Sequence, residues 1–271
     1  LGFSLNSFDH FVNYSQKQKV DLEKLFIIGL IGKRDDGSYF DIFRGRIIFP
    51  ITNTYGKIVG FGARKLFEND DSGKYINSKE SLIYNKSKIL YGLSFSKEEI
   101  RKSDSAILVE GYMDFLTLYQ NGIRNIVASS GTALTNDQVK ILKRYTKNIL
   151  FLYDADLAGM KATIRGLDIV LENDFDVKII TLENNEDPDS FVRKYGIEKF
   201  RYMVDNSVSF IKFISATYKK IGKLNNTVDK VNSLREIFTI LSKVKDKLKL
   251  EFYLKEVAEC FDINEGTVRQ E

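Results

Sequence analysis

Two short apolar runs, each closely followed by acidic residues, limit most strongly what this chain can fold into. Ala106–Val109 and Ile149–Leu152 are continuously apolar, which is typical of strands buried on both faces of a parallel sheet. Glu110 follows the first run, and Asp154 and Asp156 come after the second. Open α/β sheets carry their ligands at the carboxyl ends of the strands. We therefore expect these acids to meet at one edge of a sheet.

The acidic residues after these runs have the chemistry of a metal site. Carboxylates gathered at one edge repel one another unless cations lie between them, and hard oxygen ligands favour Mg²⁺ or Mn²⁺. Asp154 and Asp156 are two residues apart, so they share a face if the chain stays extended. The candidate metal ligands are Glu110, Asp114, Asp154, Asp156, Asp187 and Asp189. This set predicts a site for two or more divalent ions, the arrangement that metal-assisted phosphoryl transfer uses.

Each acid taken alone also has an ordinary structural explanation. Glu110 could complement the dipole of a following helix, and Asp114 could be a surface residue of that helix. The paired aspartates could cap a helix or, around Pro188, form a turn. All of them in this order and context favour the metal site.

Composition sets broad limits on the class of protein. At 271 residues and 43% hydrophobic, the chain is long enough for two or three subdomains with their own cores. It contains no apolar run of membrane-spanning length and no signal peptide. The lack of a membrane-spanning run indicates a soluble protein. An initiator Met is also absent, so we expect an excised fragment. Cys260 and His10 are the sole residues of their types, which argues against a disulfide, a structural zinc site or a Ser-His-Asp triad.

Charge is unevenly distributed along the chain. Residues 104–190 carry 14 acidic side chains against 8 basic ones, whereas residues 1–103 and 191–271 are net basic. An acidic centre between basic flanks suits a metal site served by surfaces that hold a polyanion. For residues 191–271 alone, a solvated basic face is the simpler interpretation.

The periodicity of apolar residues predicts a mixed α/β and α+β fold in three parts. Residues 1–103 are expected to form an α+β subdomain, residues 104–190 a central parallel sheet with helices on both faces, and residues 191–271 a helical subdomain without strands. The expected elements are a helix near Gln16–Ile28, strands at Arg46–Ile51 and Lys57–Ala63, strands near 105–109, 125–128, 149–153 and 177–181, and helices near 112–121, 135–146 and 157–173.

Basic and aromatic residues near the first two predicted strands form a candidate phosphate-binding strip. Arg44 and Arg46 are two apart on a predicted strand, so they are expected to share a face. Arg64 closes the paired strand, and Lys74, Tyr75 and Asn77 follow in a polar loop. Cationic groups suit phosphates, and a tyrosine ring offers a flat surface to a base or sugar. An ordinary charged hairpin is the alternative for any one of these residues. The glycines Gly60, Gly62 and Gly131 are expected at turn or close-packing positions.

Several motifs together resemble the RNA polymerase core of bacterial DnaG-type primases. Glu110 after a strand, with Asp154-x-Asp156 after a later strand, is similar to the signature of the TOPRIM domain of primases, topoisomerases and related nucleases. The motifs that narrow the resemblance to primases are Phe43-Arg44-Gly45-Arg46-Ile47-Ile48-Phe49-Pro50-Ile51, Val59-Gly60-Phe61-Gly62-Ala63-Arg64, Lys74-Tyr75-Ile76-Asn77-Ser78, Leu90-Tyr91-Gly92-Leu93, Val109-Glu110-Gly111-Tyr112-Met113-Asp114 and Glu186-Asp187-Pro188-Asp189. The resemblance covers roughly residues 1–265.

The resemblance implies a role for each matching residue. Glu110 corresponds to the active-site glutamate, as base or ligand, and Asp114, Asp154 and Asp156 correspond to acids that hold or orient the metals. Asp187 and Asp189 match an outer acidic pair. The residues that match the strip for template and incoming nucleotide are Arg44, Arg46, Arg64, Lys74, Tyr75, Asn77 and Lys86.

The resemblance also implies a function and partners. The chain is expected to synthesise RNA primers from ribonucleoside triphosphates on a single-stranded DNA template in the bacterial replisome, using Mg²⁺ or Mn²⁺ and forming an RNA/DNA hybrid. We expect a monomer, inhibition by guanosine tetraphosphate, and contacts to the replicative helicase and the single-strand-binding protein through parts outside this chain. The family's zinc-ribbon and helicase-interacting domains are not visible in these residues, so no zinc is expected here.

Two other functions remain open on the sequence. One is another TOPRIM enzyme, a topoisomerase or an OLD-type nuclease, although no DNA-gripping domain with a nucleophilic tyrosine is recognisable. The other is a binding module that organises a repair or recombination assembly without catalysis, against which the full set of acids argues.

Overall fold

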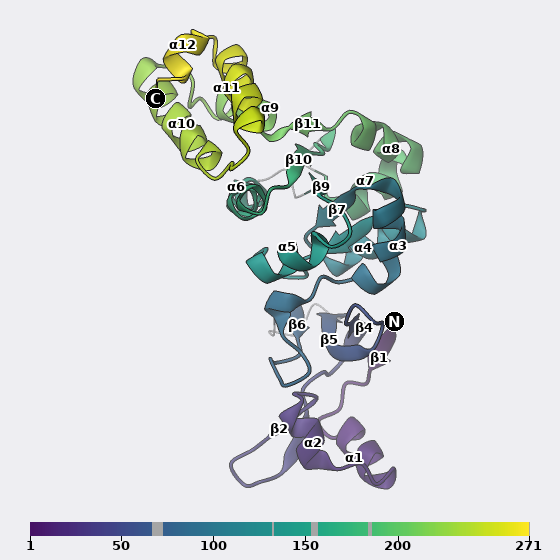
Figure 1. Cartoon of the computed structure of the whole chain (residues 1–271). Coiled ribbons are helices and arrows are strands. Elements are labelled where there is room, and N and C mark those ends of the chain that lie inside the picture. Colours follow the sequence, from purple (N-terminus) through teal and green to yellow (C-terminus); the bar gives the residue numbers. More distant parts are fainter. Residues whose placement is uncertain (67–72, 132, 153–156, 184–185, 271) are drawn as a thin grey trace. The chain divides into compact units, whose positions relative to one another are not determined.

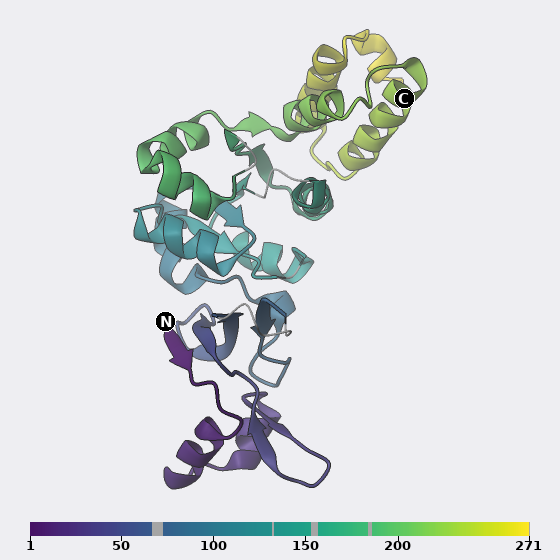
Figure 2. The same cartoon turned by 180° about the vertical axis from the view of Figure 1, so that it is seen from behind.

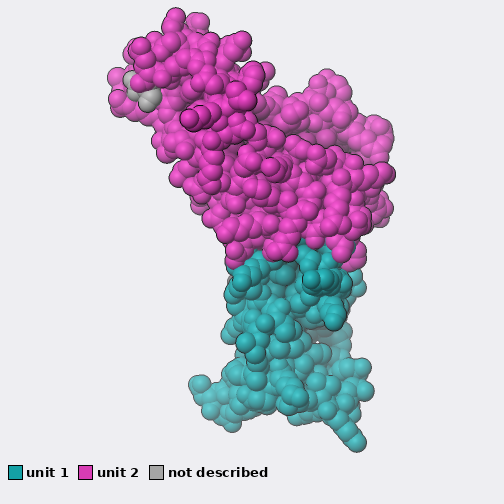
Figure 3. Space-filling view, in the orientation of Figure 1, with its two compact units in different colours: residues 1–94 teal, residues 95–271 magenta. Residues whose placement is uncertain are grey.

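The computed structural model describes residues 1–66, 73–131, 133–152, 157–183 and 186–270. The chain separates into two compact units, Leu1–Ser94 and Phe95–Glu271 (Figure 3). The narrower boundaries expected at residues 103 and 190 stay predictions. No described helix is long and apolar enough to cross a membrane.

The first unit begins with a small helical layer. The first elements of this unit along the chain are β1 (Gly2–Ser4), α1 (His10–Lys17), α2 (Leu22–Ile27), β2 (Ile31–Lys33) and β3 (Tyr39–Asp41). Val12, Leu25 and Ile31 form a buried cluster that joins α1, α2 and β2. The buried carboxylate of Asp41 accepts hydrogen bonds from the backbone N–H groups of Phe11 and Val12, at 2.7 and 3.0 Å. This places β3 against the start of α1.

The single helix expected near Gln16–Ile28 is wrong, because the chain turns between α1 and α2. Lys19 adopts a φ of 57°, a left-handed conformation that a continuing α-helix excludes. Asp21 then caps α2 by accepting hydrogen bonds from the backbone N–H groups of Glu23 and Lys24. Apolar periodicity did not reveal this break.

A sheet in the order β1-β4-β5-β6 forms the rest of the first unit. It contains β4 (Arg46–Thr52), β5 (Ile58–Lys65) and β6 (Tyr75–Asn77), and the short 3-10 helix η1 (Lys86–Lys88) follows. The expected hairpin is confirmed: β4 and β5 pair antiparallel from Arg46↔Lys65 to Thr52↔Ile58. Its turn ends at Gly56, whose φ of 81° suits a residue without a Cβ.

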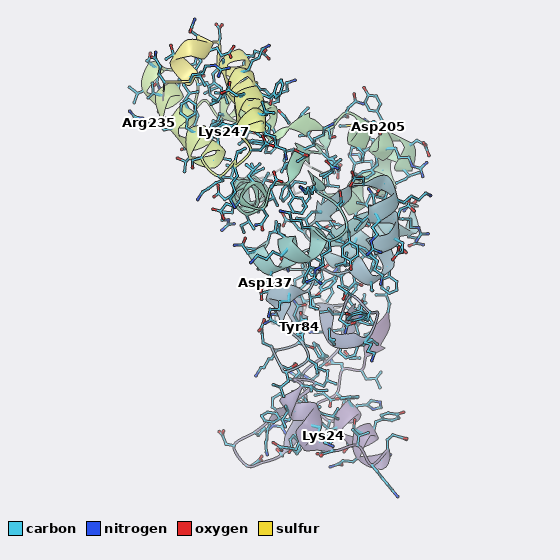
Figure 4. The ribbon with its side chains drawn as sticks, viewed as in Figure 1. Lys24, Tyr84, Asp137, Asp205, Arg235 and Lys247 are labelled. Atoms are coloured by element: carbon cyan, nitrogen blue, oxygen red, sulfur yellow. The ribbon has the colours of Figure 1, made fainter. Side chains whose placement is uncertain are left out.

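Gly60 of β5 lies against the ring of Tyr84, which Figure 4 labels. A Cβ on Gly60 would approach three ring atoms of Tyr84 at 3.1–3.2 Å. Tyr84 is 4% exposed, and burial raises the pKa of its phenol to about 12. The expectation that Gly60 is a close-packing position is therefore confirmed, and the φ of 80° at Gly131 confirms a turn there.

The second unit is built on a sheet in the order β11-β10-β9-β7-β8. Its strands are β7 (Ala106–Val109), β8 (Ile126–Ala128), β9 (Asn148–Phe151), β10 (Asp176–Ile179) and β11 (Val208–Ser209). β7 to β10 pair in parallel, and β11 pairs antiparallel to β10. Each of β7 to β10 begins within one residue of its expected position, because continuous apolar runs mark buried strands well.

Helices cover both faces of this sheet. They are α3 (Leu93–Ser103), α4 (Tyr112–Gln120), α5 (Asn136–Leu142), α6 (Leu157–Glu172), α7 (Pro188–Tyr195) and α8 (Ile197–Asp205). α5 and α6 lie together on one side of the strands, and α3, α4 and α7 lie on the other (Figures 1 and 2). The mixed α/β class with a central parallel sheet is thus confirmed.

The C-terminal part is helical, but it is not free of strands. Its helices are α9 (Phe210–Lys220), α10 (Thr227–Leu241), α11 (Lys247–Phe261) and α12 (Glu265–Val268). The expectation of no strand after residue 190 is wrong, since β11 extends the central sheet. A two-residue strand has no periodicity of its own, and its neighbour β10 supplies the hydrogen bonds that define it. Lys249 of α11 also pairs with Asp174 and Asp176, at 3.1 and 3.0 Å.

The contact between Gly60 and Tyr84 gives a prediction about stability. Gly60→Ala should lower the free energy of unfolding by about 1–3 kcal/mol, because the buried ring has little room to move away from an added methyl group. Thermal unfolding followed by circular dichroism would measure this. Gly2→Ala is the matched control, since a Cβ there meets its nearest neighbour at an ordinary 3.9 Å. An equal loss in both variants would contradict the packing explanation.

Candidate metal and nucleotide site

Glu110 lies at the carboxyl end of β7, where the chain leaves the sheet. Its backbone carbonyl accepts a hydrogen bond from the N–H of Ser130 at 2.9 Å, just after Ser129 bonds to Val109 at 3.1 Å. These bonds continue the β7–β8 pairing past both strands. The Oε1 atom of Glu110 is shielded from solvent. The backbone of the proposed catalytic residue is thus fixed by the sheet rather than by a loose loop.

Asp114 has a defined structural role at the start of α4. Gly111 is the N-cap of this helix, and its N–H donates to Oδ2 of Asp114 at 2.9 Å. A Cβ on Gly111 would lie only 2.9 Å from the same oxygen. Glycine therefore lets the carboxylate reach back over the helix terminus, where a negative charge is favoured.

Asp154 and Asp156 lie outside the described residues. The strand that leads to them is β9, which pairs in parallel with β7 through Leu108↔Phe151. Leu152 continues this pairing, because its N–H donates to Leu108 at 2.9 Å. The described chain therefore pairs with β7 as far as Leu152, at the edge of the sheet where Glu110 lies, and the two aspartates follow Leu152 in the sequence.

Asp187 and Asp189 both have partners at α7. Asp187 is the N-cap and accepts from the N–H of Ser190 at 2.7 Å, and the buried Pro188 occupies the first turn, a position that proline favours. Asp189 accepts from the hydroxyl of Thr117 on α4 and from Nε of Arg193 at 2.9 Å. This acid therefore joins α7 to α4.

Sequence reasoning did not single out Thr117 or Arg193. The four-residue spacing of Asp189 and Arg193 is a detectable helical signal. The approach of Thr117 depends on the packing of α4 against α7, which no local pattern encodes. Lys194 also holds Glu186 at 2.8 Å, and this contact lowers the pKa of the Glu186 carboxyl.

The donor set fits a hard divalent cation. The residues predicted as ligands supply carboxylate oxygens, which Mg²⁺ and Mn²⁺ prefer over nitrogen and sulfur. Within the described ranges, no three or more His, Cys, Asp or Glu side chains gather as a metal cluster. Two of the predicted ligands, Asp154 and Asp156, lie outside those ranges. Among the other predicted ligands, Asp114 caps α4, Asp187 caps α7, and Asp189 joins these two helices.

Part of the predicted basic strip shares one face of the sheet of the first unit. Arg64 of β5 pairs directly with Tyr75 of β6, and its guanidinium lies 5.9 Å from the centre of the tyrosine ring. Asn77 is two residues beyond Tyr75, so it projects to the same face. Tyr75 is 38% exposed, so part of its surface is accessible to solvent.

The two arginines that open the strip do not share a strand face, so that expectation is wrong. β4 begins at Arg46, and Gly45 with a φ of 60° interrupts the extended chain before it. The guanidinium of Arg44 lies over the ring of Phe8 at 4.3 Å. Arg46 is 2% exposed, and its NH1 donates to the carbonyl of Gly73 at 3.0 Å. Its position suits a residue that orders the backbone before β6.

Lys74 and Lys86 complete the predicted strip. Lys74 is exposed immediately before β6, and its carbonyl accepts from the N–H of Lys65 at 2.9 Å. Lys86 begins η1, and its N–H donates to Glu80 at 2.9 Å. The roles of these residues in nucleotide or DNA binding stay predictions.

Comparison with known proteins decides the family. Residues 1–97 match the family DNA primase catalytic core, N-terminal domain, and residues 107–192 match the Toprim-like family. A crystal structure of a DNA primase domain from Pseudomonas aeruginosa is 31% identical, with a TM-score of 0.84, over 99% of this chain and 85% of that one. The chain belongs to the DNA primase family. The resemblance expected from the motifs is confirmed.

Other primases match over nearly the whole chain. The DNA primase of Clostridium acetobutylicum is 39% identical over 270 residues, which are 99% of this chain and 44% of that protein. The chain thus spans less than half the length of the curated primases that it matches. A structure of the DnaG primase catalytic domain bound to single-stranded DNA is 29% identical, with a TM-score of 0.83, over 98% of this chain and 84% of that one.

The cap at α4 gives a prediction that separates the effect of the Asp114 hydrogen bond on stability from the effect of the Asp114 charge. Asp114→Ala should lower the free energy of unfolding by about 1 kcal/mol, because the N–H of Gly111 loses its acceptor. Asp114→Asn should lower the free energy of unfolding much less, since the amide oxygen can accept the same hydrogen bond. Chemical denaturation of both variants would measure the difference. Equal losses would show that the charge of Asp114, and not its hydrogen bond, stabilises the helix.

Proposed function

We propose that this chain is the catalytic core of a bacterial replicative primase. It would join ribonucleoside triphosphates on a single-stranded DNA template by metal-assisted nucleotidyl transfer. The observation that carries the proposal is Glu110 at the carboxyl end of β7, beside the parallel strand β9 that leads to Asp154 and Asp156. Matches to primase cores in both units support it.

The acids of the second unit would hold the divalent ions. Glu110, Asp154 and Asp156 are the proposed ligands, with Asp114, Asp187 and Asp189 around them. Bound Mg²⁺ or Mn²⁺ would supply charge neutralisation for the triphosphate and its leaving pyrophosphate. Glu110 would also accept a proton from an attacking hydroxyl, and the fixed position of its backbone supports this role.

The first unit would handle the nucleic acid and the nucleotide. The stacked pair of Arg64 and Tyr75, with Asn77 on the same face, offers one cation and one ring surface to a strand. The exposed Lys74 would hold the β- and γ-phosphates of the incoming nucleotide. Arg46 would act through the backbone of residues 73–74, which its guanidinium contacts, and Arg44 and Lys86 would add charge nearby.

The proposed partners follow from this role. They are the single-stranded template, ribonucleoside triphosphates and the RNA/DNA hybrid in the bacterial cytoplasm. The replicative helicase and the single-strand-binding protein would bind through parts of the protein outside this chain, and guanosine tetraphosphate would compete at the Lys74 end. We propose a monomeric core.

Replacing Glu110 tests the proposal directly. Glu110→Gln should lower the rate of primer synthesis by about 100-fold or more, because it removes a ligand charge or a general base while keeping the shape of the side chain. Labelled ribonucleotides on single-stranded DNA, with Mg²⁺ or Mn²⁺, would measure synthesis, and fluorescence anisotropy would show unchanged DNA binding.

Glu198→Gln, which changes an exposed acid on α8, is the matched control and should keep wild-type activity. Synthesis by Glu110→Gln within a few-fold of wild type would exclude Glu110 as an essential group. Cleavage of DNA in place of synthesis by the wild type would indicate a TOPRIM nuclease instead.

A further inference from the structure

The edge of the central sheet opposite Glu110 is also an organised surface. β7, β8 and β9 are parallel, so the segments that enter them, residues 104–105, 121–125 and 143–147, meet at their amino ends. Hydrogen bonds join these segments directly. Asn125 donates to Oγ of Ser105 at 3.0 Å, and Thr146 donates to Oδ1 of Asp104 at 2.9 Å. The three segments therefore form one platform.

This platform is net basic, because Asp104 is the one acidic residue in its three segments. Four of the eight Lys and Arg residues of the acidic segment 104–190 lie in it, and two more end the preceding helix α3. We call these residues the amino-edge cluster: Arg101, Lys102, Arg124, Lys143, Arg144 and Lys147. All of them are exposed. Glu110 follows the carboxyl end of β7, so it and the amino-edge cluster lie at opposite ends of this strand.

Two arginines of the cluster stack on tyrosine rings. The guanidinium of Arg124 lies 4.1 Å from the ring centre of Tyr119, and that of Arg101 lies 4.8 Å from the ring centre of Tyr145. Arg101 thereby bridges α3 to the segment before β9. A guanidinium that lies over a ring remains cationic, and arginine and aromatic side chains both stack on planar groups such as nucleobases.

Nearby acids neutralise only part of this charge. Lys147 pairs with Asp174 at 3.3 Å. On α3, Arg101 pairs with Glu98 at 3.3 Å and Lys102 pairs with Glu99 at 3.8 Å, and exposed pairs of this kind are weak. Lys143 donates to the backbone carbonyl of Asn173 at 2.6 Å and keeps its charge. Among the described residues, no acid lies within ion-pair distance of Arg124 or Arg144.

We propose that the amino-edge cluster binds single-stranded nucleic acid as a second contact, away from the candidate metal site. Clustered cations attract phosphates, and guanidinium–tyrosine stacks offer planar surfaces to unpaired bases without reading their sequence. An acidic protein partner would be attracted by the cationic groups, but it would have no bases to stack on the guanidinium–tyrosine pairs. This binding makes and breaks no covalent bond, so it is separate from the proposed nucleotide transfer. It would lengthen the stretch of single strand that the core holds.

Salt-dependent binding tests the cluster. Arg124→Ala combined with Arg144→Ala should weaken binding of a long labelled oligo-dT several-fold, measured by fluorescence anisotropy without nucleotides or metal. The slope of log K against log salt should fall by about 1.4, because each lost phosphate contact removes about 0.7 on a single strand. Arg235→Ala combined with Lys255→Ala is the control: both residues are exposed, on α10 and α11, and the change in net charge is the same (Figure 4 labels Arg235). The control should keep the wild-type slope.

Arg124→Lys tests the stacking separately. It keeps the charge, so the salt slope should stay at the wild-type value, whereas the preference for oligo-dT over an abasic strand of equal length should decrease. An unchanged slope in the double alanine variant, or an equal loss in the control, would overturn the proposal. Weaker binding of polyglutamate with unchanged binding of oligo-dT would also overturn it and indicate an acidic protein partner. Primer synthesis by the wild type tests the proposed function independently of these results.

Discussion

The parallel pairing of β7 with β9 is the interaction on which both proposed surfaces depend. Register through Ile107↔Leu150 and Leu108↔Phe151, continued by Leu152, aligns the ends of the two strands. At the carboxyl ends, this alignment brings Glu110 beside the chain that leads to the paired aspartates. At the amino ends, the same alignment brings together the basic segments that enter the strands. Hydrogen bonds between buried backbones therefore organise charges that would otherwise repel one another.

Several acids that we propose for the metal site also serve the fold. Asp114 and Asp187 accept backbone hydrogen bonds at helix termini, and Asp189 joins α4 to α7 through Thr117. Capping and metal binding are compatible, because a carboxylate has two oxygens and about four lone-pair positions. The caps would hold these side chains in place before a cation arrives, which lowers the entropy lost on binding.

Sequence predicted the central sheet well and the first unit less well, for physical reasons. The strands β7 to β10 are marked by their apolar residues, whereas the break at Lys19 depends on one left-handed residue. The expectation that Arg44 and Arg46 share a strand face was wrong, because Gly45 adopts a φ of 60° between them and β4 begins only at Arg46. Burial of Arg46 and the contact of Thr117 with Asp189 arise from tertiary packing, which spacing in the sequence does not encode. The acid motifs correctly indicated the family, whereas the metal-binding role of these residues stays a prediction.

Calorimetric titration with Mn²⁺ tests the central claim most directly, because it measures the metal site without requiring catalysis. Asp154→Asn and Asp156→Asn should each lower Mn²⁺ affinity at least about 10-fold, which corresponds to about 1.4 kcal/mol. Asp205→Asn, an exposed aspartate at the end of α8 (Figure 4), should bind Mn²⁺ as tightly as the wild type does. Equal affinity in all four proteins would contradict a metal site at the carboxyl edge of β7 and β9.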